Sequence, residues 1–245
     1  MVGTPQPSRP CQRLESKPGL EQKDLEFSRS GKLLAYARKT SLQTLIIRRI
    51  NMSNACIIAF GDSSWANAPG FKSQAGFVIG LADQAALTSE GGLWSLLAWR
   101  SYRIKRVCRS TLAAETSACD VALDLAEYIR KIALEMLDVG QRATDRTQGQ
   151  KDVVDLPTYV VTDCRSLFDL LTKMSAPGAS VTEKRVAIDI FAIREILPKE
   201  RVRWVPTFKK LADGLTKIMA PIKIWAVVTA ENVSLKGSVT FAQDS

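Results

Sequence analysis

The stretch "IIAFGDSSWA" at residues 57–66 places an acid directly after an apolar run. Its first four residues predict a buried strand, and Gly61 and Asp62 are expected to end that strand. An aspartate in this position either forms a turn by bonding its own backbone, or is presented by the strand for chemistry. For a single acid the turn is the more common case. The choice therefore depends on whether other acids occupy matching positions.

Composition excludes several classes of protein. The chain has 245 residues, 46% of them hydrophobic and 24% charged, as in an ordinary globular protein. Apolar runs are too short to cross a bilayer, and the N-terminus lacks the apolar core of a signal peptide, so we expect no membrane partner and no secretion. Five cysteines without a CxxC pair favour a reducing compartment. The absence of histidine excludes Ser-His-Asp triads, Cys-His dyads and histidine metal sites.

The net charge of +9 indicates a polyanionic partner. Much of the basic character gathers in "WRSYRIKRVCR" at 99–109, which holds five cations, two aromatic residues and no acid. Charged strand edges do prevent aggregation, but this density exceeds that need, and we interpret the stretch as a nucleic-acid-binding surface. The candidate residues are Trp99, Arg100, Tyr102, Arg103, Lys105, Arg106, Arg109 and Ser110.

The order of the expected elements predicts an α/β fold. Strand-like runs span 55–62, 73–82 and 94–103. Short loops join them into an antiparallel meander, and a long helix follows, with Ser110 and Thr111 as candidate N-caps. A strand ending at Asp163, two helices, a fifth strand and a final helix complete the pattern. We expect a five-stranded mixed sheet flanked by helices, with its first three strands antiparallel.

Four acids occupy matching positions in this scheme. Asp62 and Asp163 both end apolar strands, and parallel neighbours would bring both carboxylates to one edge of the sheet. Glu115 lies near the start of the long helix among small residues, and Asp213 lies early in the last helix, although each also fits as a first-turn helix acid. Like charges at close range force protonation, whereas two Mg²⁺ ions with oxygen ligands would hold all four and clamp a phosphodiester.

Four quoted stretches, in this order, resemble the ribonuclease H domain of copia-type retrotransposon polyproteins. They are "FGDSSWANAPGFKSQAGFVIGL", "STLAAET", "YVVTDCRSLFDLL" and "RVRWVPTFKKLADGLTK". The resemblance implies a ribonuclease H-like fold and hydrolysis of the RNA strand of RNA–DNA hybrids with two Mg²⁺ ions, for which Mn²⁺ could substitute. It implies Asp62, Glu115, Asp163 and Asp213 as the catalytic and metal-binding set. Within this set, Asp62 bridges both ions, and Asp213 helps to hold the ion that activates water.

The resemblance also implies a biological context. The partners would be an RNA–DNA hybrid and the reverse transcriptase portion of the same polyprotein, in a cytoplasmic retroelement particle or the nucleus. We expect a disordered leader at 1–23, a remnant of the upstream polymerase or connection region at 24–50, the ribonuclease H-like domain at 51–220 and a C-terminal extension at 221–245. Within the second of these, the run at 42–50 is expected to form a strand.

Two departures from the family pattern leave an alternative open. Ser64 stands where family members commonly carry a second acid, and Ala187 replaces the histidine of a His-Ile-Asp motif. The alternative is a catalytically decayed retroelement fragment that acts at most as a nucleic-acid-binding module. An integrase or transposase relative fits less well, because Glu115 lies on the helix after the third strand rather than on a late helix.

Overall fold

The computed structural model describes residues 30–42, 44–88, 91–144, 155–173, 181–217 and 232–235. The chain divides into two units, Met1–Thr44 and Leu45–Ser245. In the first unit, residues 30–39 form a helix. The leader expected at 1–23 lies outside the described residues, as does most of the expected C-terminal extension. The second unit contains the sheet and the candidate site.

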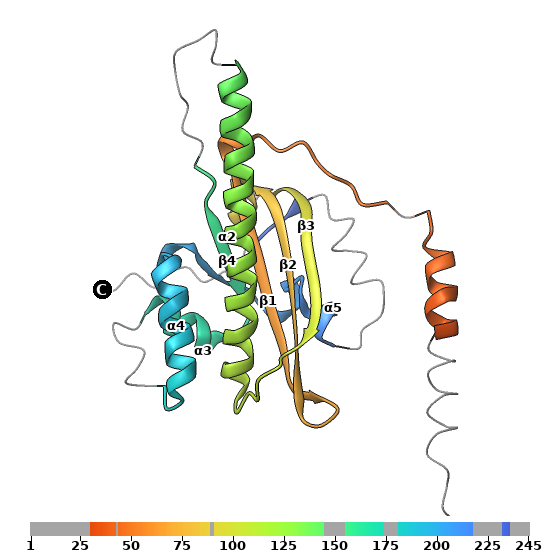
Figure 1. The fold of residues 1–245 in the computed structure, drawn as a ribbon, viewed down its shortest axis with the longest axis vertical. Helices are drawn as coiled ribbons and strands as arrows, with labels where there is room; N and C mark the ends of the chain where they lie inside the picture. Colours follow the sequence, from red (N-terminus) through yellow and green to blue (C-terminus); the bar gives the residue numbers. More distant parts are fainter. Residues whose placement is uncertain are drawn as a thin grey trace, which may run out of the picture. The chain divides into compact units, whose positions relative to one another are not determined.

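The second unit is built on one mixed sheet with the strand order β5-β4-β1-β2-β3-β6 (Figure 1). Its strands are β1 (Ala55–Ala68), β2 (Lys72–Asp83), β3 (Gly92–Arg103), β4 (Thr158–Thr162), β5 (Val202–Trp204) and β6 (Asn232–Val233). The first three strands are antiparallel, whereas β4 runs parallel to β1 and β5 runs parallel to β4. The predicted five-stranded mixed sheet is confirmed, and β6 adds a two-residue strand antiparallel to the start of β3.

Helices cover the sheet of the second unit. They are α2 (Thr111–Thr144), α3 (Arg165–Thr172), α4 (Lys184–Ile196) and α5 (Asp213–Thr216), with 3₁₀ turns η1 (Met52–Asn54), η2 (Gln84–Leu87), η4 (Lys199–Arg201) and η5 (Thr207–Lys209). The long helix α2 packs along β1, β2 and β4 and also contacts α3 and α4 (Figure 1). The short α5 contacts the first three strands. Within the described ranges, no helix combines the length and apolar character needed to cross a membrane.

Two apolar layers sandwich the sheet because successive strand residues face opposite sides. Ile57 and Ala59 of β1 are buried in the layer beneath α2. Ile58 and Phe60 are buried in the layer on the other side, which also contains Ala212 beside α5. This alternation continues after Phe60, so Gly61 and Ser63 face α2 whereas Asp62 faces the opposite side of the sheet.

Three expectations about element boundaries are wrong. Asp62 lies inside β1 rather than at its end, because β1 continues to pair with β2 as far as Ala68. Residues 44–50 form no strand, since their described backbone contact to the sheet is limited to Arg48, which bonds the Ser95 side chain. The final helix, which "KKLADGLTKIM" at 209–219 predicts, has only four residues within the described part of the chain, so Lys210 lies in the irregular segment before it.

The start of α2 follows the predicted capping. Ser110 Oγ accepts a hydrogen bond of 3.1 Å from the backbone N–H of Ala113, which satisfies a donor that the first turn of a helix leaves unpaired. Farther along, α2 lies close to β1 because Gly61 has no side chain. A Cβ atom at Gly61 would stand 2.9 Å from the Cα of Cys119. Gly61 therefore sets how near α2 can bring its acid to the sheet.

We expect Gly61→Ala to destabilise the second unit by about 1–3 kcal/mol, because the added methyl group pushes α2 away from β1. Urea unfolding followed by circular dichroism measures this difference. Gly31→Ala is the matched control, since a Cβ atom at Gly31 meets no atom within 4 Å. An unchanged urea midpoint in Gly61→Ala would contradict the proposed role of this close contact.

Candidate active site

Asp62 lies where β1 loses its parallel neighbour. β4 pairs with β1 from Ile57 to Phe60 and ends at Thr162, whereas β1 continues. On its other side Asp62 still pairs with β2. The residue is only 2% exposed. Its carboxylate therefore stands at a gap in the sheet edge, where side chains from both faces can meet.

Glu115 reaches this gap from α2. It is 5% exposed, and its Oε1 accepts hydrogen bonds from the backbone N–H and the hydroxyl of Ser63, at 3.2 and 2.8 Å. Ser63 follows Asp62 in β1 and points to the opposite face, toward α2. Two consecutive residues of one strand therefore place two acids: Asp62 directly, and Glu115 through the hydrogen bonds of Ser63.

Asp163 is the first residue after β4 and is partly buried. Its Oδ2 accepts a hydrogen bond of 2.9 Å from the hydroxyl of Thr207. Its backbone carbonyl accepts another of 2.9 Å from the indole N–H of Trp204 in β5. Because β4 runs parallel to β1, the end of β4 brings Asp163 to the gap beside Asp62, as the sequence predicts.

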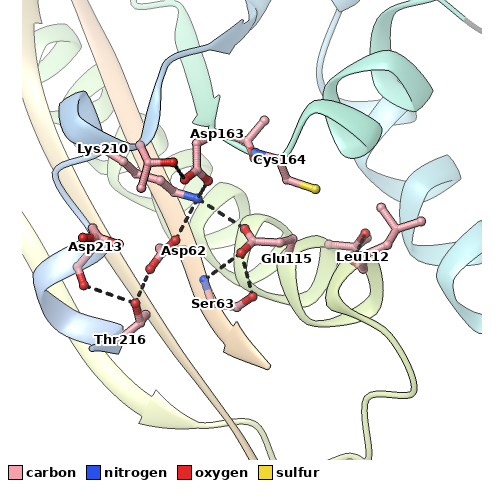
Figure 2. Close-up of polar contacts among 12 residues, drawn as sticks. Asp62, Ser63, Leu112, Glu115, Asp163, Cys164, Lys210, Asp213 and Thr216 are labelled. Atoms are coloured by element: carbon pink, nitrogen blue, oxygen red, sulfur yellow. Dashed lines mark hydrogen bonds and ion pairs between the residues drawn. The ribbon is translucent and has the colours of Figure 1, made fainter. Parts of the chain in front are cut away.

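The ammonium group of Lys210 occupies the centre of the three acids (Figure 2). Its Nζ lies 2.9 Å from Asp62 Oδ1 and 3.2 Å from Glu115 Oε2, and it also forms an ion pair with Asp163 Oδ1. The side chain of Lys210 has no exposed surface. One buried cation thus bridges carboxylates that come from β1, α2 and the end of β4.

The pKa shifts follow from this burial and charge. Burial alone would lower the pKa of Lys210, but Glu115, Asp62 and Asp163 outweigh it and raise the pKa above the ordinary lysine value. Burial raises the pKa of Glu115, and the charge of Lys210 opposes this shift without cancelling it. For Asp163 the net direction is opposite: burial raises its pKa, but Lys210 and the Thr207 hydroxyl together outweigh burial and lower it. The ammonium is therefore charged at neutral pH and holds Asp163 ionised.

Asp213 is the one predicted acid that does not join this cluster. It is buried at the start of α5, and its carboxylate forms an ion pair with Lys217. The same short helix does reach the site, because Thr216 donates a hydrogen bond to Asp62 Oδ2 (Figure 2). The structure therefore gathers three of the four predicted acids. The fourth, Asp213, lies on the short helix that contacts the site through Thr216.

The donor set of the gathered acids suits a hard divalent cation. Each of Asp62, Glu115 and Asp163 offers a carboxylate oxygen, and these oxygens lie within 4.8 Å of one another. Oxygen donors from carboxylates are the ligands that Mg²⁺ prefers in proteins. The ammonium of Lys210 lies at the point on which all three carboxylates converge.

Sequence reasoning missed Lys210. The sequence places Lys209 and Lys210 together at the start of the expected final helix, and nothing in that pattern distinguishes the buried lysine from its partly exposed neighbour. The usable signal is electrostatic. Four carboxylates predicted at one spot require compensating positive charge, and a lysine three residues before one of them, Asp213, is close enough in the chain to supply part of it.

The predicted basic surface is divided between two faces of β3. Ser101 donates a hydrogen bond to the carbonyl of Leu215 in α5, whereas Tyr102 packs in the layer beneath α2. Neighbouring strand residues alternate accordingly. The α5 face holds Trp99 and Arg103, and the α2 face holds Arg100 and Tyr102.

The remaining basic residues lie in the loop that joins β3 to α2. Lys105 and Arg109 are exposed, whereas Arg106 forms an ion pair with Asp189 of α4. Ser110 is occupied as the cap of α2. A cleft of about 560 Å³ opens between this loop and α4. It is lined by Arg106, Val107, Arg109, Glu183 and Arg185.

The sheet order and strand directions define a ribonuclease H-like fold, as the resemblance implied: an antiparallel β1-β2-β3 meander, followed by β4 and β5 parallel to β1. No protein-family model matches the chain, and no curated protein sequence matches it.

Solved structures similar to this chain include an RNase H1 and a viral protease-reverse transcriptase. An RNase H1 isolated from compost by a metagenomic approach is 23% identical, with a TM-score of 0.35, and the match covers 65% of this chain and 91% of that one. The prototype foamy virus protease-reverse transcriptase is 16% identical, with a TM-score of 0.37. That match covers 69% of this chain but only 21% of the viral protein.

We expect Lys210→Gln to destabilise the second unit by about 3–5 kcal/mol in metal-free buffer at pH 7, because it leaves buried carboxylates without a counter-charge. Urea unfolding in the presence of a chelator measures the loss. Lys209→Gln removes the same charge from the neighbouring, partly exposed position and is expected to cost far less. Equal losses in the two variants would show that Lys210 does not balance the acids.

Proposed function

We propose that the second unit is a metal-dependent nuclease that hydrolyses the RNA strand of RNA–DNA hybrids. The observation that supports this most directly is the convergence of Asp62, Glu115 and Asp163 on one buried point at the carboxyl end of β4. The sequence resemblance to ribonuclease H domains supports the choice of substrate. Discrimination of RNA from DNA would depend on contacts to the 2′-hydroxyl groups.

Each residue of the site has a definable role in this proposal. Asp62, Glu115 and Asp163 would hold Mg²⁺ or Mn²⁺, and bound divalent ions would supply an activated water and stabilise the charge on the leaving oxygen. Ser63 orients Glu115 through its two hydrogen bonds. Thr207 orients Asp163 in the same way. The carboxylates are thus positioned before any substrate binds.

Asp213 would complete a second cation position together with Asp62. Thr216 already links α5 to the Asp62 carboxylate, so the helix that bears Asp213 lies against the site. Lys217 pairs with Asp213 and would have to release it. The proposed set of four acids therefore requires a rearrangement of side chains within α5 and the residue that follows it.

The exposed cations of β3 and the loop after it would bind the phosphates of the hybrid. Arg103, Lys105 and Arg109 are exposed there, and Trp99 is exposed for contact with sugars or bases. Arg106 has a different role in this proposal, because its ion pair with Asp189 ties the loop to α4. A retroelement origin would make the reverse transcriptase portion of the same polyprotein the natural partner.

A second candidate function is favoured by one observation. Lys210 fills the point on which the acids converge, as expected of a decayed site that has replaced its metal by an ammonium. In that case the domain would bind nucleic acid without cutting it. Hydrolysis measurements distinguish the two functions.

We expect cleavage of the RNA strand of a labelled RNA–DNA hybrid in Mg²⁺ and no cleavage of matched single-stranded RNA or duplex DNA. Asp62→Asn and Asp163→Asn should each reduce the rate by at least about a hundredfold, because each removes a charged ligand. Asp155→Asn is the control, since that aspartate is 76% exposed and outside the site. Undiminished cleavage by either site variant would refute the metal assignment, and an inactive but folded wild type would favour the binding module.

We expect Arg103→Glu combined with Lys105→Glu to weaken hybrid binding and to flatten its dependence on salt, because fewer counterions are then released. Fluorescence anisotropy across a salt series measures both effects. Lys199→Glu with Lys184→Glu makes the same change of net charge at exposed positions of η4 and α4. If both double variants lose affinity equally, the binding surface lies elsewhere.

A further inference from the structure

The ammonium of Lys210 occupies the point at which Asp62, Glu115 and Asp163 would bind a metal ion. Its ammonium contacts all three gathered carboxylates, and its side chain is inaccessible to solvent. Its neighbour Lys209 is partly exposed. The position of Lys210 is therefore a specific feature of the site and not a consequence of a generally basic segment.

An ammonium and a divalent cation cannot share this point. Mg²⁺ binds carboxylate oxygens at about 2.0–2.1 Å, closer than the 2.9 and 3.2 Å contacts of the Lys210 nitrogen to Asp62 and Glu115. Both cations would need the same oxygens, and they would repel each other across a short, poorly hydrated distance. Occupation by one cation therefore excludes the other.

The backbone allows the side chain of Lys210 to leave without unfolding an element. Its N–H donates to the carbonyl of Thr207 at 3.1 Å, and its carbonyl accepts from the N–H of Asp213 at 3.3 Å. These contacts hold the main chain between η5 and α5, whereas the four-carbon stem of a lysine is free to rotate. Release of the ammonium would thus be a side-chain movement.

We infer that Lys210 is a tethered competitor of the metal: it fills the site and offsets part of its negative charge when no divalent ion is bound, and it is expelled when one binds. This inference rests on the proposed metal site but not on the proposed hydrolysis. If Lys210 stays outside the metal-free site in about one molecule in a thousand, the apparent metal affinity is about a thousandfold weaker than that of a site without the lysine. The lysine would then set the metal concentration at which the site fills.

Amine acetylation of the wild-type chain, read by mass spectrometry, tests the expulsion directly. Without divalent ions Lys210 should react far more slowly than the exposed Lys105. Adding MnCl₂ should raise the rate at Lys210 by about tenfold or more and leave Lys105 unchanged, whereas NaCl at the same ionic strength should change neither. Protection of Lys210 at Mn²⁺ concentrations that saturate the site would overturn the inference.

Direct Mn²⁺ binding, followed by electron paramagnetic resonance, gives the second measurement. We expect Lys210→Gln to bind Mn²⁺ at least about a hundredfold more tightly than the wild type, and Lys209→Gln to bind like the wild type. Mn²⁺ should also restore much of the stability that Lys210→Gln loses, since ligand binding to the folded state stabilises it. Equal affinity of Lys210→Gln and wild type would overturn the inference, and if Lys210→Gln does not fold, the acetylation experiment decides.

The two proposals fail separately. Metal-dependent exposure of Lys210 in a protein that cuts no hybrid would support the competitor role and refute the nuclease. Hybrid cleavage with Lys210 still protected would support the nuclease and refute the competitor role.

Discussion

The burial of three carboxylates at one point is the constraint on which the site depends. Asp62, Glu115 and Asp163 come from separate elements, and their mutual repulsion would force protonation or separation if nothing balanced them. The structure solves this with a charged lysine, itself stable in the interior only because the acids surround it. Neither the acids nor the ammonium would be stable when buried alone, so the three acids and Lys210 stabilise one another in the interior.

Backbone geometry decides where this cluster of three acids and Lys210 can form. β4 is five residues long and stops pairing with β1 at Phe60, which opens the sheet edge where Asp62 emerges. Through that gap, Glu115 arrives from the α2 face and Lys210 from the α5 face. Gly61 lets α2 lie close enough for Glu115 to reach Ser63. The length of one strand and the absence of one side chain therefore fix the position of the acid cluster.

The predictable parts are those with a periodic signal. Apolar runs and turn residues indicated the five strands, and two runs ending in Asp62 and Asp163 indicated which strands are neighbours. The true end of β1 was missed, because the hairpin pairing with β2 continues through polar residues that look like a turn. Lys210 was missed because its position depends on a tertiary contact of an irregular segment. The basic stretch was read as one surface, although strand alternation divides it between two faces.

Because Lys210 lies among the three acids, their convergence is not by itself evidence of a catalytic metal site. A buried ammonium and a divalent ion satisfy the same carboxylates, so the convergence of these acids reflects charge balance first and catalysis second. A decayed site would be expected to keep the lysine in place permanently, since nothing would select for its departure. A nuclease that binds its metal on these three acids needs a lysine that gives way. The exchange between the two cations, rather than the number of acids, is therefore the property that separates an enzyme from a structural relic of one.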